Sequence, residues 1–317
     1  MIRLQEYFEN GLNQLKLVNT LTGEQVNILP QFGANVNELV LAKNSRCYNL
    51  LDGTNSRDKL VGNAVYKGAK LVPCPNRVAS GQYEFRGQNY QLACNEQALN
   101  NALHGFIYDK PFSVKDVDGS KNEATLTLVY KYAGDIAGYP FPMDIEIELT
   151  LSEKYGFYCS TKITNTGTNP MPIGDGWHPF LTFHKKVDDL QLKLPVQQKI
   201  AIDEQMIPTG KLHDYTEFTE LQPIASTVFD TCFTVKDSDE TYQSTLLHDP
   251  ESNVTIKLWQ ETGLGKYNYL QVYIPPDRSS IAIEPMTCNV NAFNNGDGLI
   301  VLEANQQFEA AYGIRLV

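Results

Sequence analysis

Hydrophobic and polar residues alternate with a period of two along several stretches of the chain, which is the pattern of β-strands with one buried face. The alternation is clearest at residues 143–151, returns at residues 157–163 and is also present at residues 123–132. A short polar segment with a glycine separates the first two stretches, so residues 143–163 are predicted to form a β-hairpin. The glycine and proline within residues 165–170 supply the turn that ends it.

The C-terminal part of the chain repeats this pattern. Residues 267–274, 280–283 and 308–317 are predicted strands, with a Pro-Pro-Asp-Arg turn between the first two. No stretch sustains the spacing of a long amphipathic helix, and only residues 95–102 favour a short helical turn. Because strands do not alternate with helices, the sequence argues against parallel α/β folds and predicts an all-β, mostly antiparallel fold.

The domain organisation follows from the same pattern. A length of 317 residues would suit two ordinary domains. The sequence contains no internal repeat, low-complexity block or linker that would mark a boundary. We therefore expect a single domain, residues 1–317, in which large sheets pack face to face.

The charge balance excludes some classes of partner. The chain has 26 Lys and Arg against 37 Asp and Glu, a formal net charge of −11. Nucleic acids and anionic membranes are bound through clustered cations, so neither is an expected partner. No apolar run is long enough to span a bilayer as a helix, and the first residues lack the basic and apolar segments of a signal peptide.

The six cysteines are scattered without a CxxC pair, which fits neither a zinc site nor a dense disulfide framework. We expect six reduced thiols, a cytoplasmic location and no metal. A glycine-rich nucleotide loop is also missing from the sequence, so no cofactor is expected.

Three stretches carry polar residues where strand alternation does not require them. The first contains Arg77 and, further on, His104; the second contains His178; the third contains Glu284. Each has an ordinary explanation: the histidines as structural residues at strand ends, Glu284 as the first solvent-facing residue after a strand, Arg77 as a surface cation. Asp230 likewise suits a turn. Together, however, they form a plausible acid–base set if the fold brings them together.

At these residues the chain resembles the aldose 1-epimerase family, also called galactose mutarotases. The resemblance runs from about residue 20 to the end. Its motifs are Asn76-Arg77-Val78, residues 87–92, Asn101-Ala102-Leu103-His104-Gly105-Phe106, Trp177-His178-Pro179-Phe180, Phe229-Asp230 and Ile283-Glu284-Pro285-Met286-Thr287. The order of these motifs is more specific than any one of them.

The resemblance implies a single-domain β-supersandwich with an open sugar cleft. Glu284 matches the general base of the family, His178 its general acid and His104 a second active-site histidine. Trp177 stands before the acid where many members have a glycine. The implied partner is a small monosaccharide, and the implied assembly is a monomer or homodimer.

The resemblance also implies substrate-binding residues. Arg77 and Asp230 match residues that hydrogen-bond sugar hydroxyls, and Asn76 precedes Arg77 in the same motif. Phe229-Asp230 is a short motif and the weakest of the matches. A guanidinium can donate in a fork to neighbouring hydroxyls, which an ammonium cannot.

The chemistry of anomer exchange suits these residue types. Ring opening needs a base that takes the proton of the C1 hydroxyl and an acid that protonates the ring oxygen, and the roles reverse on closure. A carboxylate, with an ordinary pKa near ~4.3, suits the base, and an imidazole, near ~6.5, suits the acid. Each typically contributes ~10²–10⁴-fold to the rate.

Three other functions remain open at this point. A hexose 6-phosphate epimerase would need additional cations beside the cleft, and the motifs contain no Arg/Lys cluster. A glycosidase would use two carboxylates, for which Glu284 and Asp230 are candidates, but would leave both histidines without a role. A non-catalytic carbohydrate-binding β-sandwich would need neither acid nor base.

Overall fold

The computed structural model of the protein describes residues 1–54, 56–61, 65–236 and 238–317. Strands make up most of this part of the chain. The helical elements are short: α1 (Arg57–Val61), α2 (Ala292–Asn295), and the 3-10 turns η1 (Ile107–Asp109) and η2 (Val187–Asp189). The predicted all-β class is therefore confirmed. None of the helices in the described residues has the length and apolar character needed to cross a lipid bilayer.

The largest sheet has nine strands, and every described pairing in it is antiparallel. In spatial order its strands are β10 (Ser113–Gly119), β11 (Glu123–Tyr132), β12 (Met143–Ser152), β13 (Gly156–Asn165), β26 (Gln307–Leu316), β22 (Val254–Glu261), β21 (Tyr242–Asp249), β16 (Gln191–Lys193) and β19 (Gln222–Pro223). The C-terminal strand β26 thus lies in the middle of this sheet, between β13 and β22.

Two further sheets complete the main architecture. The six-stranded sheet has the order β15 (Phe180–Leu181), β24 (Ile281–Met286), β23 (Tyr269–Tyr273), β20 (Asp230–Val235), β17 (Val196–Ile202) and β18 (Pro208–Asp214). The five-stranded sheet has the order β1 (Ile2–Glu9), β2 (Leu12–Asn19), β3 (Gln25–Leu29), β4 (Asn35–Lys43) and β5 (Arg46–Asn49).

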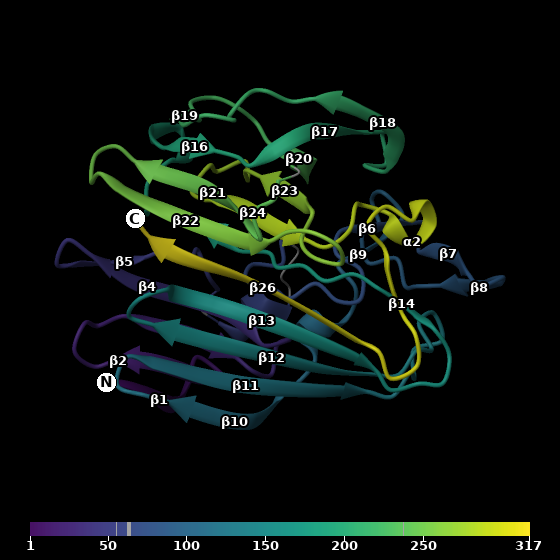
Figure 1. The fold of residues 1–317 in the computed structure, drawn as a ribbon, viewed down its shortest axis with the longest axis horizontal. Helices are drawn as coiled ribbons and strands as arrows, with labels where there is room; N and C mark the ends of the chain where they lie inside the picture. The colour runs from purple at the N-terminus through teal and green to yellow at the C-terminus, as the bar shows by residue number, and fades with distance from the viewer. Residues whose placement is uncertain (55, 62–64, 237) are drawn as a thin grey trace.

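Three two-stranded ribbons lie at the end of the molecule opposite the chain termini (Figure 1). They pair β6 (Arg77–Ala79) with β9 (Asn101–Leu103), β7 (Gln82–Phe85) with β8 (Gln88–Gln91), and β14 (Met171–Ile173) with β25 (Ile300–Leu302).

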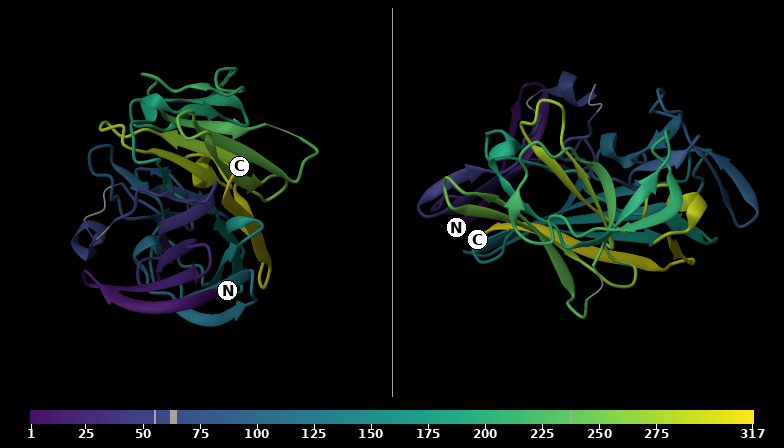
Figure 2. Two further views of the ribbon diagram at one scale, coloured as in Figure 1. Left: turned by 90° about the vertical axis from the view of Figure 1, so that its left-hand side faces the viewer. Right: turned by 90° about the horizontal axis from the view of Figure 1, so that it is seen from above.

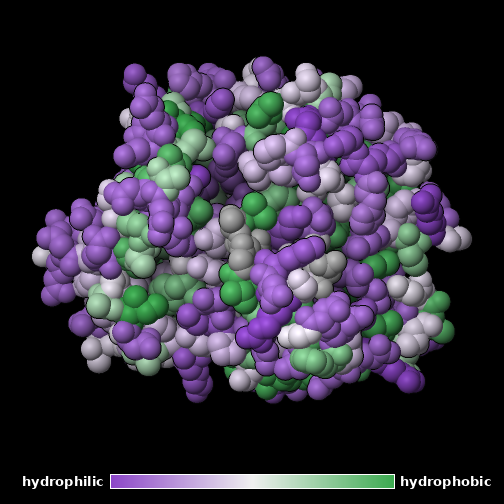
Figure 3. Space-filling view, turned by 180° about the vertical axis from the view of Figure 1, so that it is seen from behind, coloured by the Kyte–Doolittle hydropathy of each residue, from purple (hydrophilic) through white to green (hydrophobic). Residues whose placement is uncertain are grey.

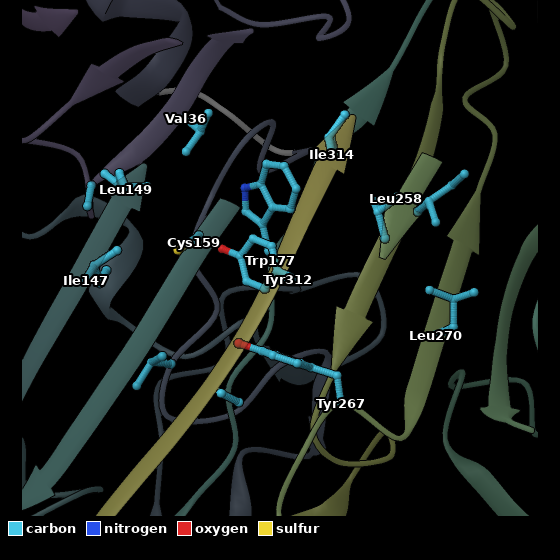
Figure 4. Close-up of a cluster of buried hydrophobic side chains, with 14 of the residues drawn as sticks. Val36, Ile147, Leu149, Cys159, Trp177, Leu258, Tyr267, Leu270, Tyr312 and Ile314 are labelled. Atoms are coloured by element: carbon cyan, nitrogen blue, oxygen red, sulfur yellow. The ribbon is translucent and has the colours of Figure 1, made fainter. Parts of the chain in front are cut away.

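The sheets form two layers. The five- and six-stranded sheets lie on the same side of the nine-stranded sheet, whose other side faces outward (Figures 1 and 2). One large cluster of buried side chains draws on all three sheets, with Val36, Ile147, Leu258 and Leu270 among its members (Figure 4). The predicted face-to-face packing is confirmed. A single domain stays a prediction, which this shared core supports.

Strand alternation explains why one side of the nine-stranded sheet can face solvent. Along β13 the side chains at 157, 159, 161 and 163 are buried, and those between them are only partly buried. β22 alternates in the same way. A half-buried antiparallel strand needs apolar residues only at every second position, which is the pattern that the sequence shows.

Two sequence-based expectations need correction. Residues 95–102 form a turn that leads into β9 rather than a helical turn. The strand predicted at 280–283 continues as β24 to Met286, so Glu284 is a buried strand residue, 2% exposed, and not the first residue in solvent. Pro285 is tolerated inside β24 because its carbonyl accepts from Trp177, so the side on which it lacks an N–H faces the Trp177 segment and not the β23 ladder.

A buried ion pair lies in the core beneath the ends of these strands. The Lys70 Nζ is 2.7 Å from an Asp175 carboxylate oxygen, and both side chains are at most 2% exposed. The Tyr267 hydroxyl donates to the other oxygen at 2.6 Å, and Lys70 also donates to the Thr161 hydroxyl at 2.8 Å. The ammonium lies 5.0 Å from the centre of the Tyr312 ring. Both buried charges are therefore paired and hydrogen-bonded.

We expect Lys70→Met to lower the free energy of unfolding by about 3–5 kcal/mol, because it leaves the Asp175 carboxylate buried without its counter-charge. A double variant, Lys70→Met with Asp175→Leu, should be more stable than this single variant, since no unpaired charge remains. Denaturant unfolding measures both. As a control, Arg86→Met breaks an exposed pair with Glu303 and should change stability by less than about 1 kcal/mol. A double variant no more stable than Lys70→Met would contradict this account.

Candidate active site

The six-stranded sheet positions the two carboxylates. Glu284 lies in the middle of β24, opposite Gln271 on β23 in the strand register. Asp230 is the first residue of β20 and pairs with Tyr273 on the other side of β23. The register of three neighbouring strands therefore places Glu284, Gln271 and Asp230 close together, although they are far apart in the sequence.

His178 is held in place by backbone hydrogen bonds on both sides of it. Its N–H donates to the Ala69 carbonyl at 3.0 Å, and its own carbonyl accepts from the Gly68 N–H at 2.9 Å. The preceding Trp177 donates its N–H to the Pro285 carbonyl at 3.2 Å, next to Glu284. These bonds fix His178 relative to β24.

The side chain of Trp177 anchors the same segment in the core. Its ring stacks on Tyr312 with centroids 4.8 Å apart and 12° between the planes (Figure 4). Tyr312 lies on β26, so the segment that carries His178 packs on the inner face of the nine-stranded sheet. A glycine at this position would leave this contact unmade.

The β6–β9 ribbon brings in His104 and Asn76. The His104 N–H donates to the Asn76 carbonyl at 2.9 Å, and the Asn76 N–H donates to His104 Nδ1 at 3.2 Å. Both residues have positive φ, 64° and 59°. The following Gly105 also has a φ of 68°, and a Cβ there would collide with the Val72 carbonyl. The sharp turn after β9 therefore requires glycine.

His104, His178 and Glu284 meet as a buried trio. The His178 Nε2 is 3.4 Å from a Glu284 carboxylate oxygen, and the two imidazole rings are 5.2 Å apart, edge to face. The three residues are 5%, 6% and 2% exposed. His178 also stacks on Phe180, and the edge of Tyr66 contacts His104. The second oxygen of Glu284, Oε2, is buried without a hydrogen-bond partner among the described residues.

Burial shifts the pKa values of the trio toward the neutral forms. It raises the pKa of Glu284 well above its ordinary value, an effect that the Asp230 charge strengthens and Arg77 weakens. It lowers the pKa of His178 to about 3. It also lowers the pKa of His104, with smaller contributions from His178 and Arg77. Buried groups titrate this way because the charged form loses its hydration.

The trio is also the place where the described residues could hold a metal ion, since one ligand atom from each lies within 4.8 Å of the others. The hydrogen bonding of His104 disfavours this. Its Nδ1 accepts the Asn76 N–H, so in the neutral ring Nε2 carries the proton and has no lone pair to offer. The trio therefore suits proton transfer better than metal binding.

A chain of hydrogen-bonded polar side chains runs beside the trio, and we call it the polar chain. Asp230 accepts from Gln271 at 2.8 Å, and Gln271 accepts from Asn76 at 3.4 Å. Asn76 in turn accepts from Arg77 at 3.3 Å. The Asp230 side chain is exposed, but protein crowds its carboxyl, and this desolvation raises its pKa against the opposing effect of Arg77.

The remaining contacts of Arg77 bear on the expectation that its guanidinium donates in a fork to sugar hydroxyls. Its guanidinium forms a fork with Glu96, with both N···O distances at 2.8 Å, so the fork is not free for sugar hydroxyls. Asn101 also donates to Glu96 at 3.0 Å. Burial alone would raise the pKa of Glu96, but these hydrogen bonds lower it overall. Of the five guanidinium N–H groups, three have partners among the described residues, and two stay available to a ligand.

All six residues singled out in the sequence thus lie in one site. They are His104, His178 and Glu284 in the trio, and Asn76, Arg77 and Asp230 in the polar chain. Sequence reasoning missed Glu96 and Gln271, and it named Asn101 only as part of a motif, without a role. Gln271 had a usable signal, because it is a polar residue inside the apolar run of a buried strand.

Comparison with known proteins identifies the family of this chain. The sequence profile of the aldose 1-epimerase family matches residues 15–315. The chain belongs to the aldose 1-epimerase family. It is 32% identical over 254 residues to YihR of Escherichia coli, an uncharacterized protein, with 78% of each chain covered.

Two other relatives extend the comparison. The maltose epimerase of Levilactobacillus brevis is 24% identical over 308 residues, covering 92% of this chain and 80% of that one. A galactose mutarotase-like protein from Clostridium acetobutylicum has a similar structure, with a TM-score of 0.89 at 20% identity, covering 100% and 98% of the two chains. The expected β-supersandwich fold of the mutarotases is therefore confirmed, and the family acts on sugars.

The buried imidazoles predict a pH-dependent stability. The pKa of His178 is about 3 in the folded chain and ~6.5 in an unfolded one. Between these values the unfolded chain binds a proton that the folded chain does not. The stabilising contribution is therefore complete above pH ~6.5 and is lost as the pH falls, at up to about 1.4 kcal/mol per pH unit. Glu284 has the opposite sign, because its raised pKa favours the folded chain at lower pH.

We expect His178→Gln to flatten the fall in stability between pH 6.5 and 5 relative to the parent, measured by denaturant unfolding at each pH. The matched control is His213→Gln, which removes an exposed histidine of β18 and should leave the slope as it is in the parent. Equal slopes for the parent and the His178 variant would show that His178 does not stay neutral in the folded chain.

Proposed function

We propose that the protein is an aldose 1-epimerase that interconverts the α and β anomers of a free aldose. The observation that carries this proposal is the contact between His178 and Glu284, buried at 3.4 Å with pKa values shifted in opposite directions. A base and an acid held side by side at one site are what reversible ring opening requires.

Glu284 is proposed as the base. Its raised pKa makes the carboxylate a stronger proton acceptor, and Oε2 has no partner among the described residues, so it is available to the C1 hydroxyl. His178 is proposed as the acid. Its lowered pKa makes the imidazolium a stronger donor toward the ring oxygen. Transfer is easier in both directions when the protein group and the sugar oxygen differ less in proton affinity.

We call Glu284 and His178 the catalytic pair. In the state that reacts, the two groups together hold one exchangeable proton. A carboxylate with an imidazolium and a carboxylic acid with a neutral imidazole have the same total charge, zero. Burial favours this neutral total over a site with a net charge. During ring opening the sugar gives one proton to the pair and takes one from it, so the total charge does not change. After rotation about C1–C2 the same two groups act in reverse.

His104 and the polar chain are proposed to bind the sugar. The hydrogen bond at Nδ1 leaves the Nε2–H of His104 as a donor in the trio. Asp230 offers carboxylate oxygens, Asn76 joins the polar chain to His104 of the trio, and Arg77 has two N–H groups left. Gln271 holds both Asp230 and Asn76 and so positions them.

The charges near the trio favour a neutral sugar over a phosphorylated one. Two cations lie close by in the described structure, and each is already paired. Arg77 is bound by Glu96, and Lys67, whose ammonium lies 5.5 Å from the ring of Phe180, is bound by Asp52 at 2.6 Å. A phosphate would have to compete with these carboxylates, so a hexose 6-phosphate epimerase is the weaker alternative.

Substitution of the acid and the base tests the proposal. We expect Glu284→Gln and His178→Asn each to slow enzymatic anomer exchange by ~10²–10⁴-fold. Polarimetry of freshly dissolved α-anomers of glucose, galactose and maltose gives the rates after subtraction of the buffer-catalysed rate.

The matched controls are His213→Asn and Glu309→Gln, which lie outside the site and should keep the parent rate. Circular dichroism of each variant shows that it is folded. Parent rates in both site variants would overturn the assignment. Exchange at the buffer rate with the parent itself would indicate a carbohydrate-binding module, and release of sugar from a glycoside would indicate a glycosidase built on Glu284 and Asp230.

The pKa shifts predict the pH profile of the rate. The working pair persists between the low pKa associated with His178, about 3, and the raised pKa of Glu284. Because the two groups interact, each pKa seen in a rate profile describes the pair and not one residue alone. We therefore expect kcat/KM to be level through neutrality, with an acidic limb well below ~6.5, the ordinary value of imidazole. An acidic limb centred near 6.5 in a chain that is still folded would contradict the proposed burial of His178.

A further inference from the structure

The outer face of the nine-stranded sheet carries a groove that the proposed function does not use. Figure 1 looks onto this face, where β13, β26 and β22 lie next to one another. The groove has a volume of about 370 Å³, and we call it the outer groove. It is lined by Tyr155, Tyr158, Tyr242, Lys257, Trp259 and Arg315.

The Trp259 ring forms the floor of the outer groove, and it can lie there because residue 313 is a glycine. Gly313 on β26 lies between Tyr158 on β13 and Trp259 on β22 in the strand register. A Cβ at Gly313 would be 2.7 and 2.8 Å from two atoms of the Trp259 indole, so this ring lies across β26 where a side chain would otherwise stand. Glycine inside a strand often marks such a close approach. Tyr242 contacts the same indole edge to face, at 6.1 Å.

The wall of the outer groove holds two cations without a counter-ion. Lys257 and Arg315 are register partners on β22 and β26, so they lie side by side on the outer face. Neither side chain has an ion pair or hydrogen bond among the described residues. The Lys257 ammonium lies 5.8 Å from the centre of the Tyr242 ring. The net charge of the chain is −11, and no carboxylate lines this groove. Glu123 and Glu148 lie beyond it, beside Tyr158.

Two residues that line the outer groove also carry hydrogen-bonding groups without a partner. The indole N–H of Trp259 and the hydroxyl of Tyr242 have no partner in the part of the chain that the structure describes, and both residues line the outer groove. An aromatic surface with a few converging polar groups is the usual composition of a small-molecule site. A pair of unneutralised cations adds a preference for an anion.

The outer groove is separate from the trio. Tyr312, next to Gly313 on β26, points to the opposite face of the sheet, where Trp177 stacks on it ahead of His178 (Figure 4). The strand β26 and this stacked pair therefore lie between the two sites. Figure 3 shows the face of the molecule opposite to the outer groove, which is hollowed near its centre.

We propose that the outer groove binds an anionic sugar, a pyranose ring that carries a carboxylate or phosphate group. The apolar face of the ring stacks on Trp259, and the anionic group lies between Lys257 and Arg315. The free N–H of Trp259 and the hydroxyl of Tyr242 donate to or accept from ring hydroxyls. This inference does not depend on the proposed catalytic activity, because it uses none of the residues of the trio or the polar chain.

Tryptophan fluorescence can test this inference on the full chain. The protein has two tryptophans, and Trp177 is fully buried, so quenching by acrylamide reports mainly on Trp259. Titration with glucuronate and with glucose 6-phosphate should protect Trp259, with a Kd of about 1 mM or tighter. Glucose should bind at least tenfold more weakly, since it lacks the charge. Inorganic phosphate at the same concentration should not protect, since it lacks the ring.

The double variant Lys257→Met with Arg315→Met should raise the Kd of both anionic sugars at least tenfold and keep the parent rate of anomer exchange. Arg86→Met, which removes an exposed cation elsewhere, should leave the Kd at the parent value. If the double variant melts at a lower temperature than the parent, Arg315→Gln alone replaces it. Equal protection by glucose or by inorganic phosphate, or an unchanged Kd in the cation variants, would overturn the proposal.

Discussion

The buried ion pair between Lys70 and Asp175 is the interaction on which the position of the trio depends. Asp175 lies three residues before His178, and its N–H is bound by the Thr287 hydroxyl at 2.9 Å, three residues after Glu284. Lys70 follows Ala69, whose carbonyl accepts the N–H of His178. The pair thus ties the segment of Lys70 to that of Asp175, and Thr287 links both to β24. Because both charges are buried, neither partner can move away without leaving the other uncompensated.

The same burial sets the chemistry of the site. A carboxylate at the surface would be a weaker base than a buried one, and a surface imidazolium would be a weaker acid than a buried one. In the trio the lack of water raises the proton affinity of Glu284 and lowers that of His178. Because the two pKa shifts have opposite directions, the total charge of the pair stays at zero. Both shifts nevertheless make proton transfer between the pair and the sugar easier. The proposed chemistry therefore requires both that His178 lies next to Glu284 and that Glu284 is buried. The core beneath them provides both conditions.

Much of the fold and most of the site residues could be predicted from the sequence. Period-two alternation located β11, β12, β13 and β26 to within about two residues, because each has one buried face. The motif residues were recognisable by order and spacing. The prediction failed where distant segments pair with each other. Residues 95–102 have a local helical pattern, but Asn101 pairs with Ala79 on β6, and this strand pairing overrides the local preference.

Partners that are distant in sequence were also beyond prediction. Glu96 has no motif of its own, and only its contact with Arg77 shows that the guanidinium fork is occupied. Gln271 gains its role from the register that places it opposite Glu284. The Lys70–Asp175 pair spans 105 residues. Such contacts depend on strand register and layer packing, which a local pattern does not encode.

The distribution of paired and unpaired cations distinguishes the two faces of the molecule. Beside the trio, Arg77 and Lys67 each have a carboxylate partner, so the protein itself satisfies the positive charge there. On the outer face, Lys257 and Arg315 lie together without one, although the chain as a whole is acidic. Like charges on neighbouring strands repel each other. Two unneutralised cations over an aromatic floor favour an external anion, whereas the paired cations beside the trio favour a neutral ligand. The same physical rule, that a desolvated charge needs a partner, thus predicts a different class of ligand on each face.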